Sequence, residues 1–189
     1  MKICVYGAAS NDIKPIYIEE TERLGRAMAA RGITLVFGGG AGGMMGASAR
    51  GVRAGNGKMI AVVPRFFNVD GILFDGSTET IYTDTMRDRK RTMEDLSDAF
   101  IVSPGGIGTM DEFFEFFTLR SLDRHHKPIG ILNINGFYDG MFSLLRQAAQ
   151  DGFIRADVMD LLTVSDDSET LLDALTKQVE AAEKGGEIR

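Results

Sequence analysis

Two short segments combine charged residues and glycines in a spacing that could carry chemistry. "PGGIGTMDE" ends on Glu112, and "MRDRK" contains Arg89 and Lys90. A carboxylate beside a sugar stabilises positive charge that develops at C1′ and can orient or deprotonate an attacking water. Clustered cations at the start of a helix favour an anionic ligand. The two segments together predict a site for an anionic ligand, with Glu112 near its sugar.

Glycine-rich loops follow two of the predicted strands and open helices. "VFGGGAGGMMGAS" contains Gly38, Gly39, Gly40, Gly42 and Gly43, and "SPGGIGT" repeats the pattern later in the chain. Such loops expose backbone N–H groups at a helix N-terminus, where phosphate binds well. If the two loops converge, they form a floor for one phosphorylated ligand. The alternative is that the glycines only permit tight helix–sheet packing.

The first loop also fits Gly-x-Gly-x-x-Gly, but it does not complete a dinucleotide fingerprint. It follows the second predicted strand, and Val63 stands where an acidic residue would be needed. A Walker loop is absent as well. We therefore predict no nicotinamide cofactor.

Glu112 has a second, structural interpretation. Thr109 and Glu112 form Thr-x-x-Glu, the pattern of a capping box. In such a box the Thr109 side chain bonds the backbone amide of Glu112, and the Glu112 side chain reaches back to the backbone amide of Thr109. A box accepts glutamine as readily as glutamate, whereas chemistry that needs a negative charge or a proton acceptor does not. The two interpretations stay open at this point.

The basic cluster cannot act as one unit. At helical spacing Met86, Arg89 and Met93 share a face, so only part of the cluster can point into one site. A solvated surface is the alternative for the rest. The pair His125–His126 has no carboxylate or thiol at metal-ligand spacing and is interpreted as part of a polar loop, so we predict no metal site.

Composition restricts the partners. The chain has 189 residues, a net charge of −6 and a pI of about 5.0, which argues against nucleic acid and anionic membranes as partners. No segment approaches the ~20 apolar residues of a membrane span, and no signal sequence is recognisable. The single cysteine, Cys4, is expected to be a small buried hydrophobe, and a cytoplasmic protein is the simplest interpretation.

Short apolar runs alternate with segments of helical period, which predicts an α/β fold: a single Rossmann-like, doubly wound domain over 1–184, with a mainly parallel sheet flanked by helices. Residues 185–189 are predicted to be a flexible tail. An irregular stretch, 64–77, is expected to lie over a site. The predicted strands are 3–7, 34–37, 59–63, 80–82, 99–103, 129–132 and 161–164, and the predicted helices are 16–31, 43–54, 85–96, 109–122, 137–150 and 168–182.

Four phenylalanines, Phe113, Phe114, Phe116 and Phe117, surround most of one predicted helix. One apolar stripe is enough to pack a helix on a sheet. Burial on a second side implies either a large core or a subunit partner, and we predict a homodimer that packs partly through this helix.

The motifs "GGGAGGMMG", "MRDRK" and "PGGIGTMDE", in this order and spacing, resemble those of the LOG ("lonely guy") family, over about residues 3–175. These proteins are cytokinin riboside 5′-monophosphate phosphoribohydrolases, long mislabelled as lysine decarboxylases. The resemblance implies a Rossmann-like homodimer without metal or other cofactor. It also implies hydrolysis of the N-glycosidic bond of plain or N6-modified adenosine monophosphate, which releases free base and ribose 5-phosphate.

The resemblance further implies that Arg89 and Glu112 are the catalytic pair. The residues that it places around the substrate are Ser10, Gly39, Gly40, Met86, Lys90, Pro104, Gly105, Gly106, Gly108 and Thr109. The chain departs from the family at "YGAAS", where serines are usual, and at "TLRSLDRHHKP", which bears on base specificity. The competing function is a non-catalytic protein of the same superfamily that binds a nucleotide or molybdenum cofactor, which would have no need of Glu112.

Overall fold

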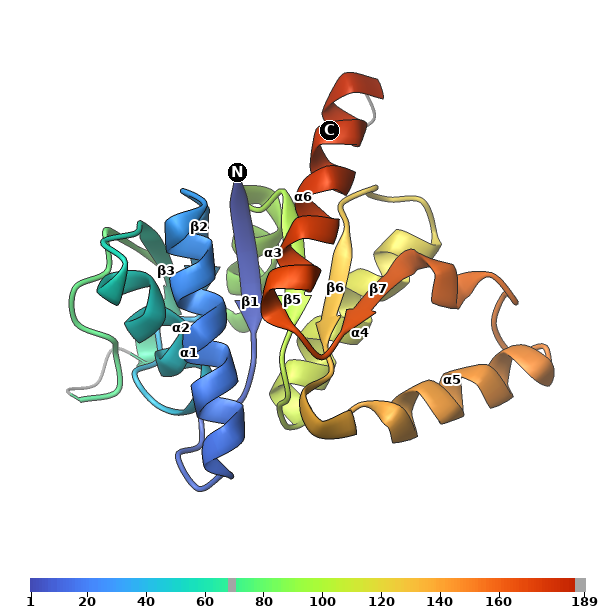
Figure 1. The fold of residues 1–189 in the computed structure, drawn as a ribbon, viewed down its shortest axis with the longest axis horizontal. Coiled ribbons are helices and arrows are strands. Elements are labelled where there is room, and N and C mark those ends of the chain that lie inside the picture. The colour runs from blue at the N-terminus through green and yellow to red at the C-terminus, as the bar shows by residue number, and fades with distance from the viewer. Residues whose placement is uncertain (68–70, 186–189) are drawn as a thin grey trace.

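The computed structural model describes residues 1–67 and 71–185 and contains one seven-stranded sheet (Figure 1). Its strand order is β4-β3-β2-β1-β5-β6-β7, and every neighbouring pair is parallel. The strands are β1 (Lys2–Tyr6), β2 (Thr34–Phe37), β3 (Met59–Pro64), β4 (Glu79–Thr83), β5 (Ala99–Val102), β6 (Ile129–Leu132) and β7 (Leu162–Ser165). The predicted doubly wound α/β domain is confirmed, with a sheet that is parallel throughout.

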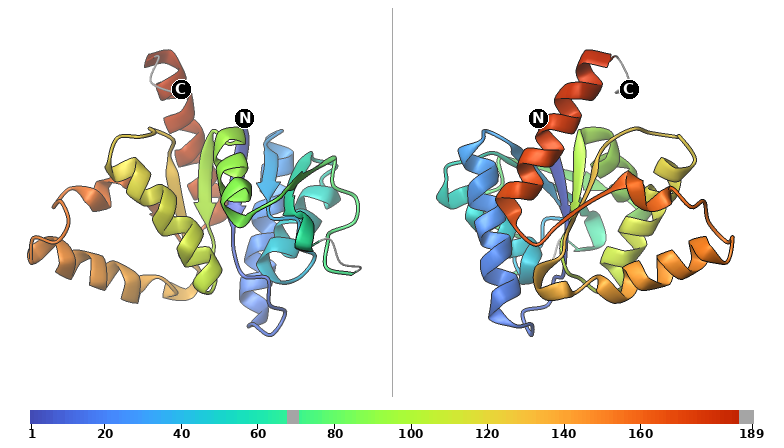
Figure 2. Two further views of the ribbon diagram at one scale, coloured as in Figure 1. Left: turned by 180° about the vertical axis from the view of Figure 1, so that it is seen from behind. Right: turned by 45° about the vertical axis from the view of Figure 1, so that its right-hand side comes forward.

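Helices cover both faces of the sheet, as its fully apolar central strands require. The helices are α1 (Pro15–Ala30), α2 (Gly43–Ala54), α3 (Met86–Leu96), α4 (Ile107–Ser121), α5 (Asp139–Gln150) and α6 (Ser168–Gly185). In β1, Ile3 and Val5 pack in the core with α1, α2 and α6, whereas Cys4 and Tyr6 pack in the core with α3, α4 and α5. Figure 1 looks onto α1 and α6, and the view from behind in Figure 2 shows α3 and α4.

The sequence order of the strands reverses at β1 and β5, which are neighbours in the sheet although more than ninety residues of sequence separate them. Ligands of open parallel sheets bind outside the carboxyl ends of the strands at such a switch point. The segments that leave β1, β2 and β5 all begin at this edge. The fold therefore brings the two glycine-rich loops to one place.

The ends of some elements differ from prediction. Helix α4 begins at Ile107 rather than at 109, and α5 begins at Asp139 after a 3-10 turn over Ile134–Gly136. Helix α6 continues through Gly185, the first residue of the predicted tail. The rest of that tail, 186–189, lies outside the described residues. No helix among those described combines the length and apolar character that crossing a bilayer requires.

The phenylalanines of α4 serve mainly the internal core. Phe113, Phe116 and Phe117 are buried against the sheet within one chain, and only Phe114 is exposed. A large core therefore accounts for three of the four, and the homodimer remains a prediction. Cys4 is buried, as expected.

His125 is not in a polar loop environment. Its ring is buried against Phe100 and Phe116, and its Nε2 lies 2.9 Å from the Phe116 carbonyl oxygen. Burial lowers the pKa of this imidazole. The segment is a loop and His126 is exposed, as predicted, so the prediction from "DRHHKP" is wrong for His125 alone. Periodicity does not show which side chain of a connecting segment turns inward.

Candidate active site

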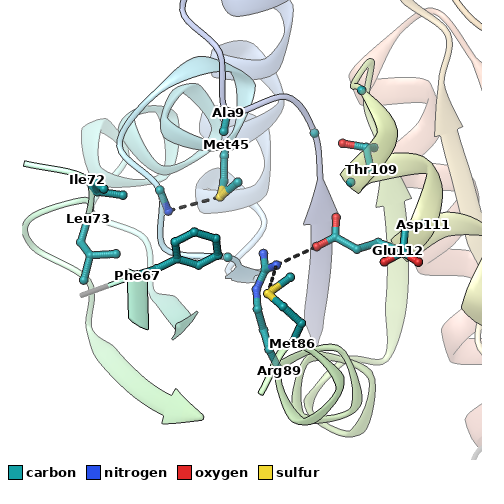
Figure 3. A pocket seen from close by; sticks show the side chains of 15 residues that line it. Ala9, Met45, Phe67, Ile72, Leu73, Met86, Arg89, Thr109, Asp111 and Glu112 are labelled. Carbon is teal, nitrogen blue, oxygen red and sulfur yellow. Dashed lines mark hydrogen bonds and ion pairs between the residues drawn. The ribbon is translucent and has the colours of Figure 1, made fainter. Parts of the chain in front are cut away.

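A cavity of about 340 Å³ opens at the switch point (Figure 3). Both glycine-rich loops contribute to its wall, together with the segment after β1, the first turn of α3 and the start of α4. Its lining residues are Gly7, Ala9, Gly38, Gly40, Met45, Phe67, Ile72, Leu73, Met86, Arg89, Gly106, Gly108, Thr109, Asp111 and Glu112. The two loops thus converge on one cavity, as the sequence predicts.

Arg89 and Glu112 meet inside this cavity although they come from different helices. Arg89 Nη1 lies 3.1 Å from Glu112 Oε1, and each side chain is only 9% exposed. Arg89 is packed tightly against the first glycine loop, because a Cβ atom on Gly38 would lie 2.0 Å from its Nη2. The sulfur of Met86 lies 3.9 Å from Nη1. Figure 3 shows the guanidinium pointing toward the Glu112 carboxylate.

Glu112 is poised for proton transfer near neutral pH. Burial is the largest influence and raises its pKa from 4.5 to about 7, while Arg89 opposes the rise. Asp111 and Glu115 add to the rise, and Lys90 opposes it. A carboxylate with this pKa can accept a proton or remain charged at physiological pH, which suits a general base or an electrostatic stabiliser.

The capping-box interpretation of Glu112 is wrong. The N-cap of α4 is Gly106, so Thr109 is the third helical residue and makes no capping hydrogen bond there. Glu112 therefore lies in the second turn and bonds Arg89 instead. A threonine cap does occur on α3, where Thr85 accepts from the Asp88 amide. That cap had not been predicted, although Thr-x-x-Asp is its signal.

Of the two helices that follow the glycine-rich loops, α4 is the one with free amides at its start. Backbone N–H groups of Gly106–Thr109 donate to no acceptor within the residues described. Helix α2 differs, because the segment after β1 closes its N-terminus: Asn11 Oδ1 accepts from Gly43, and the Ala8 carbonyl accepts from Met44 and Met45. Of the two glycine loops, the second is therefore the one that presents an anion-binding helix end.

Several predicted substrate-binding residues lie outside the cavity lining. Lys90 binds Asp111 and Glu115 on α4 rather than facing the cavity. Ser10 Oγ accepts from the Asp12 amide. Gly39 lies in an adjoining hollow. Pro104 and Gly105, in the second glycine-rich loop, also lie outside the lining. The Pro104 carbonyl accepts from the Ala8 amide, and Gly105 packs against the Thr109 side chain.

The described part of the irregular stretch 64–77 forms the apolar wall of the cavity, which supports its predicted position over a site, while 68–70 lie outside the described residues. Phe67, Ile72 and Leu73 line the cavity. The Ile72 carbonyl accepts from Ala41, and Phe74 N–H donates to the Gly39 carbonyl, at 2.9 and 2.8 Å. These bonds attach the wall to the first glycine loop. Sequence reasoning had not named these apolar residues, and the missing periodicity was their only signal.

Comparisons with known proteins identify the relatives of this chain. Residues 45–175 match a family model described as "Possible lysine decarboxylase". A cytokinin riboside 5′-monophosphate phosphoribohydrolase of Mycobacterium tuberculosis is 40% identical over 91% of both chains. The protein of that name from Oryza sativa subsp. japonica, LOG, is 34% identical over 97% of this chain and 76% of its own length.

Solved structures share the fold at lower identity. The molybdenum cofactor carrier protein of Chlamydomonas reinhardtii has a TM-score of 0.70 at 22% identity, over 95% of this chain and 98% of its own. The molybdenum cofactor binding protein of Rippkaea orientalis has a TM-score of 0.69 at 18% identity, over 93% and 94%. These two likenesses concern the fold alone. The sequence relatives match almost the whole chain, and by that similarity the chain is a member of the LOG family.

Proposed function

We propose that this protein hydrolyses the N-glycosidic bond of an adenosine 5′-monophosphate, plain or N6-modified, and releases free base and ribose 5-phosphate. The observation that carries the proposal is the position of Glu112. Its buried carboxylate pairs with Arg89 in the cavity, next to the free amides at the start of α4. Nucleotides are also the substrates that the relatives' names describe.

In this proposal the start of α4 binds the monophosphate. The amides of Gly106–Thr109 point their N–H groups at the phosphate, and the helix dipole adds to the attraction. With the phosphate fixed there, the ribose lies against Glu112, one turn further along the same helix. The apolar wall around Phe67 and Leu73 then faces the base.

The reaction adds water to C1′ and breaks the bond to the base nitrogen, which keeps the electron pair and takes up a proton. Positive charge develops on C1′ and the ring oxygen, and the Glu112 carboxylate stabilises it. Glu112 also orients the attacking water and can take its proton, which its pKa of about 7 permits. Arg89 holds the carboxylate and aligns the substrate.

The test is to incubate the purified protein with AMP and with isopentenyladenosine monophosphate and to measure free base and ribose 5-phosphate. Release from either supports hydrolysis, and the ratio of the two rates defines the preferred base. Adenosine is the control and should be a poor substrate because it lacks the phosphate that aligns the sugar. Binding of AMP without release from either nucleotide would favour a carrier and contradict the proposal.

A further inference from the structure

Lys90 follows Arg89 on α3 but reaches a different set of acids. Its Nζ lies 2.9 Å from Asp111 Oδ2 and also contacts Glu115 Oε2. The Lys90 side chain is only 16% exposed, whereas the two acids are 58% and 43% exposed. Asp111 and Glu115 stand one residue before and three residues after Glu112. One ammonium group therefore binds both acidic neighbours of the buried carboxylate.

The charges around Glu112 come from two helices. Arg89 and Lys90 face it from α3, and Asp111 and Glu115 accompany it on α4. From β1 the neighbouring titratable groups are Tyr6 and Cys4, whose pKa values are raised by burial, so both are neutral. The surroundings of Glu112 thus contain two cations and two further acids, and Lys90 is the cation that binds both acids.

We infer that Lys90 is a positioning residue for Glu112: it holds the start of α4 against α3 and balances two negative charges that would otherwise act on the Glu112 carboxylate. This role replaces the expected contact between Lys90 and the nucleotide. The inference rests on the proposed function only for its effect on the rate, because the charge balance itself belongs to the free protein.

Loss of Lys90 has a defined consequence. Asp111 and Glu115 would lose their partner, and their unopposed charge disfavours ionisation of Glu112. The pKa of Glu112 should then rise by about one pH unit, the order expected for one charge at a partly solvated site. At neutral pH the ionised fraction falls, and the rate falls with it by up to about tenfold, recovering at higher pH. A residue that bound phosphate directly would instead weaken substrate binding at every pH.

The experiment compares Lys90→Met with the triple variant Lys90→Met, Asp111→Asn, Glu115→Gln. The Glu112 carboxyl carbon is titrated by ¹³C NMR in the free protein, and kcat/KM for AMP is measured from pH 5.5 to 9. We expect Lys90→Met to shift both titrations to higher pH. The triple variant should return the NMR midpoint to that of the wild type; only this readout is used for it, because Asp111 lines the cavity. Arg91→Met is the matched control, since Arg91 is exposed and pairs only weakly with Asp95, at 3.8 Å; it should titrate like the wild type.

Two results would overturn the inference. One is an unchanged Glu112 titration in Lys90→Met, and the other is a triple variant in which the Glu112 titration stays as far shifted as in Lys90→Met. If the wild type hydrolyses no nucleotide, the proposed function fails, but the NMR titration still decides the role of Lys90. Circular dichroism shows whether each variant is folded.

Discussion

Replacing Glu112 by glutamine separates a chemical role from a structural one. The amide oxygen can still accept from Arg89 Nη1, so the hydrogen bond of 3.1 Å can be kept while the charge and the proton acceptor are lost. A positioned acid–base group contributes about 10²–10⁴-fold to a rate. We expect kcat to fall at least about a hundredfold, measured as adenine released from AMP under saturating substrate.

The same variant should be at least as stable as the wild type above neutral pH. Because burial raises the pKa of Glu112 from 4.5 to about 7, ionising this residue in the folded protein costs roughly 3 kcal/mol, as an upper bound. The cost is absent below pH 4.5, grows as the pH rises and is complete above pH 7. Any advantage of Glu112→Gln in melting temperature should follow that course.

Differential scanning calorimetry at pH 5, 6, 7 and 8 measures this advantage, with the pH dependence of kcat/KM as the second readout. In the wild type the rate should fall on the acid side with a midpoint near pH 7. A glutamine variant that keeps wild-type activity would refute the reasoning about chemistry. A variant that melts well below the wild type at pH 8 would show that the pair with Arg89 is mainly structural.

Three further variants test other parts of the site and fold. Gly38→Ala should lower kcat/KM at least about tenfold, because the new Cβ would displace the Arg89 guanidinium; Gly140→Ala on α5, where a Cβ has open space, is the folded, active control. Ile107→Pro should raise KM for AMP about tenfold with little change in melting temperature, since proline suits the first helical position but lacks the amide; Ile107→Ala keeps that amide and should keep the KM of the wild type. His125→Phe should lose less stability than the wild type when the pH is lowered from 7.5 to 5.5. Burial lowers the pKa of His125, so the wild type loses stability as the pH falls through 6.5, the ordinary pKa of histidine. Equal losses of the two proteins in thermal melts would contradict this.

The fold could be predicted because local and global signals coincide. Ile3 and Val5 alternate with Cys4 and Tyr6, and all four are buried, which is the pattern of a strand covered on both faces. Glycines and prolines separate such runs from helical segments. The residue pair Arg89 and Glu112 could also be named, although their contact could not, because it depends on the crossing of two helices.

The start of α4, the partners of Lys90 and the bonding of the α2 amides could not be predicted from the sequence, because each depends on which hydrogen-bond or ion-pair partner lies nearby in the fold. Thr109 would cap a helix that began directly after it, but α4 begins two residues earlier, at Ile107, with Gly106 as its N-cap. Lys90 could bind a phosphate or a carboxylate, and the sequence alone did not show that Asp111 and Glu115 of α4 lie within reach of its ammonium group. The amides of α2 are bonded by Ala8 and Asn11, a contact across more than thirty residues that no local pattern reveals.

Arg89 and Glu112, which form the buried ion pair, follow strands at different positions in the sheet. Glu112 belongs to a helix that follows β5, a central strand with neighbours on both sides, whereas Arg89 follows β4, which lies at the sheet border and pairs only with β3. Edge strands open more readily than central ones. Although α3 also packs on β1, β2 and β3, opening of that border would loosen the first turn of α3, which carries Arg89, and leave Glu112 in place. The proposed hydrolysis would then be lost at a lower temperature than the fold.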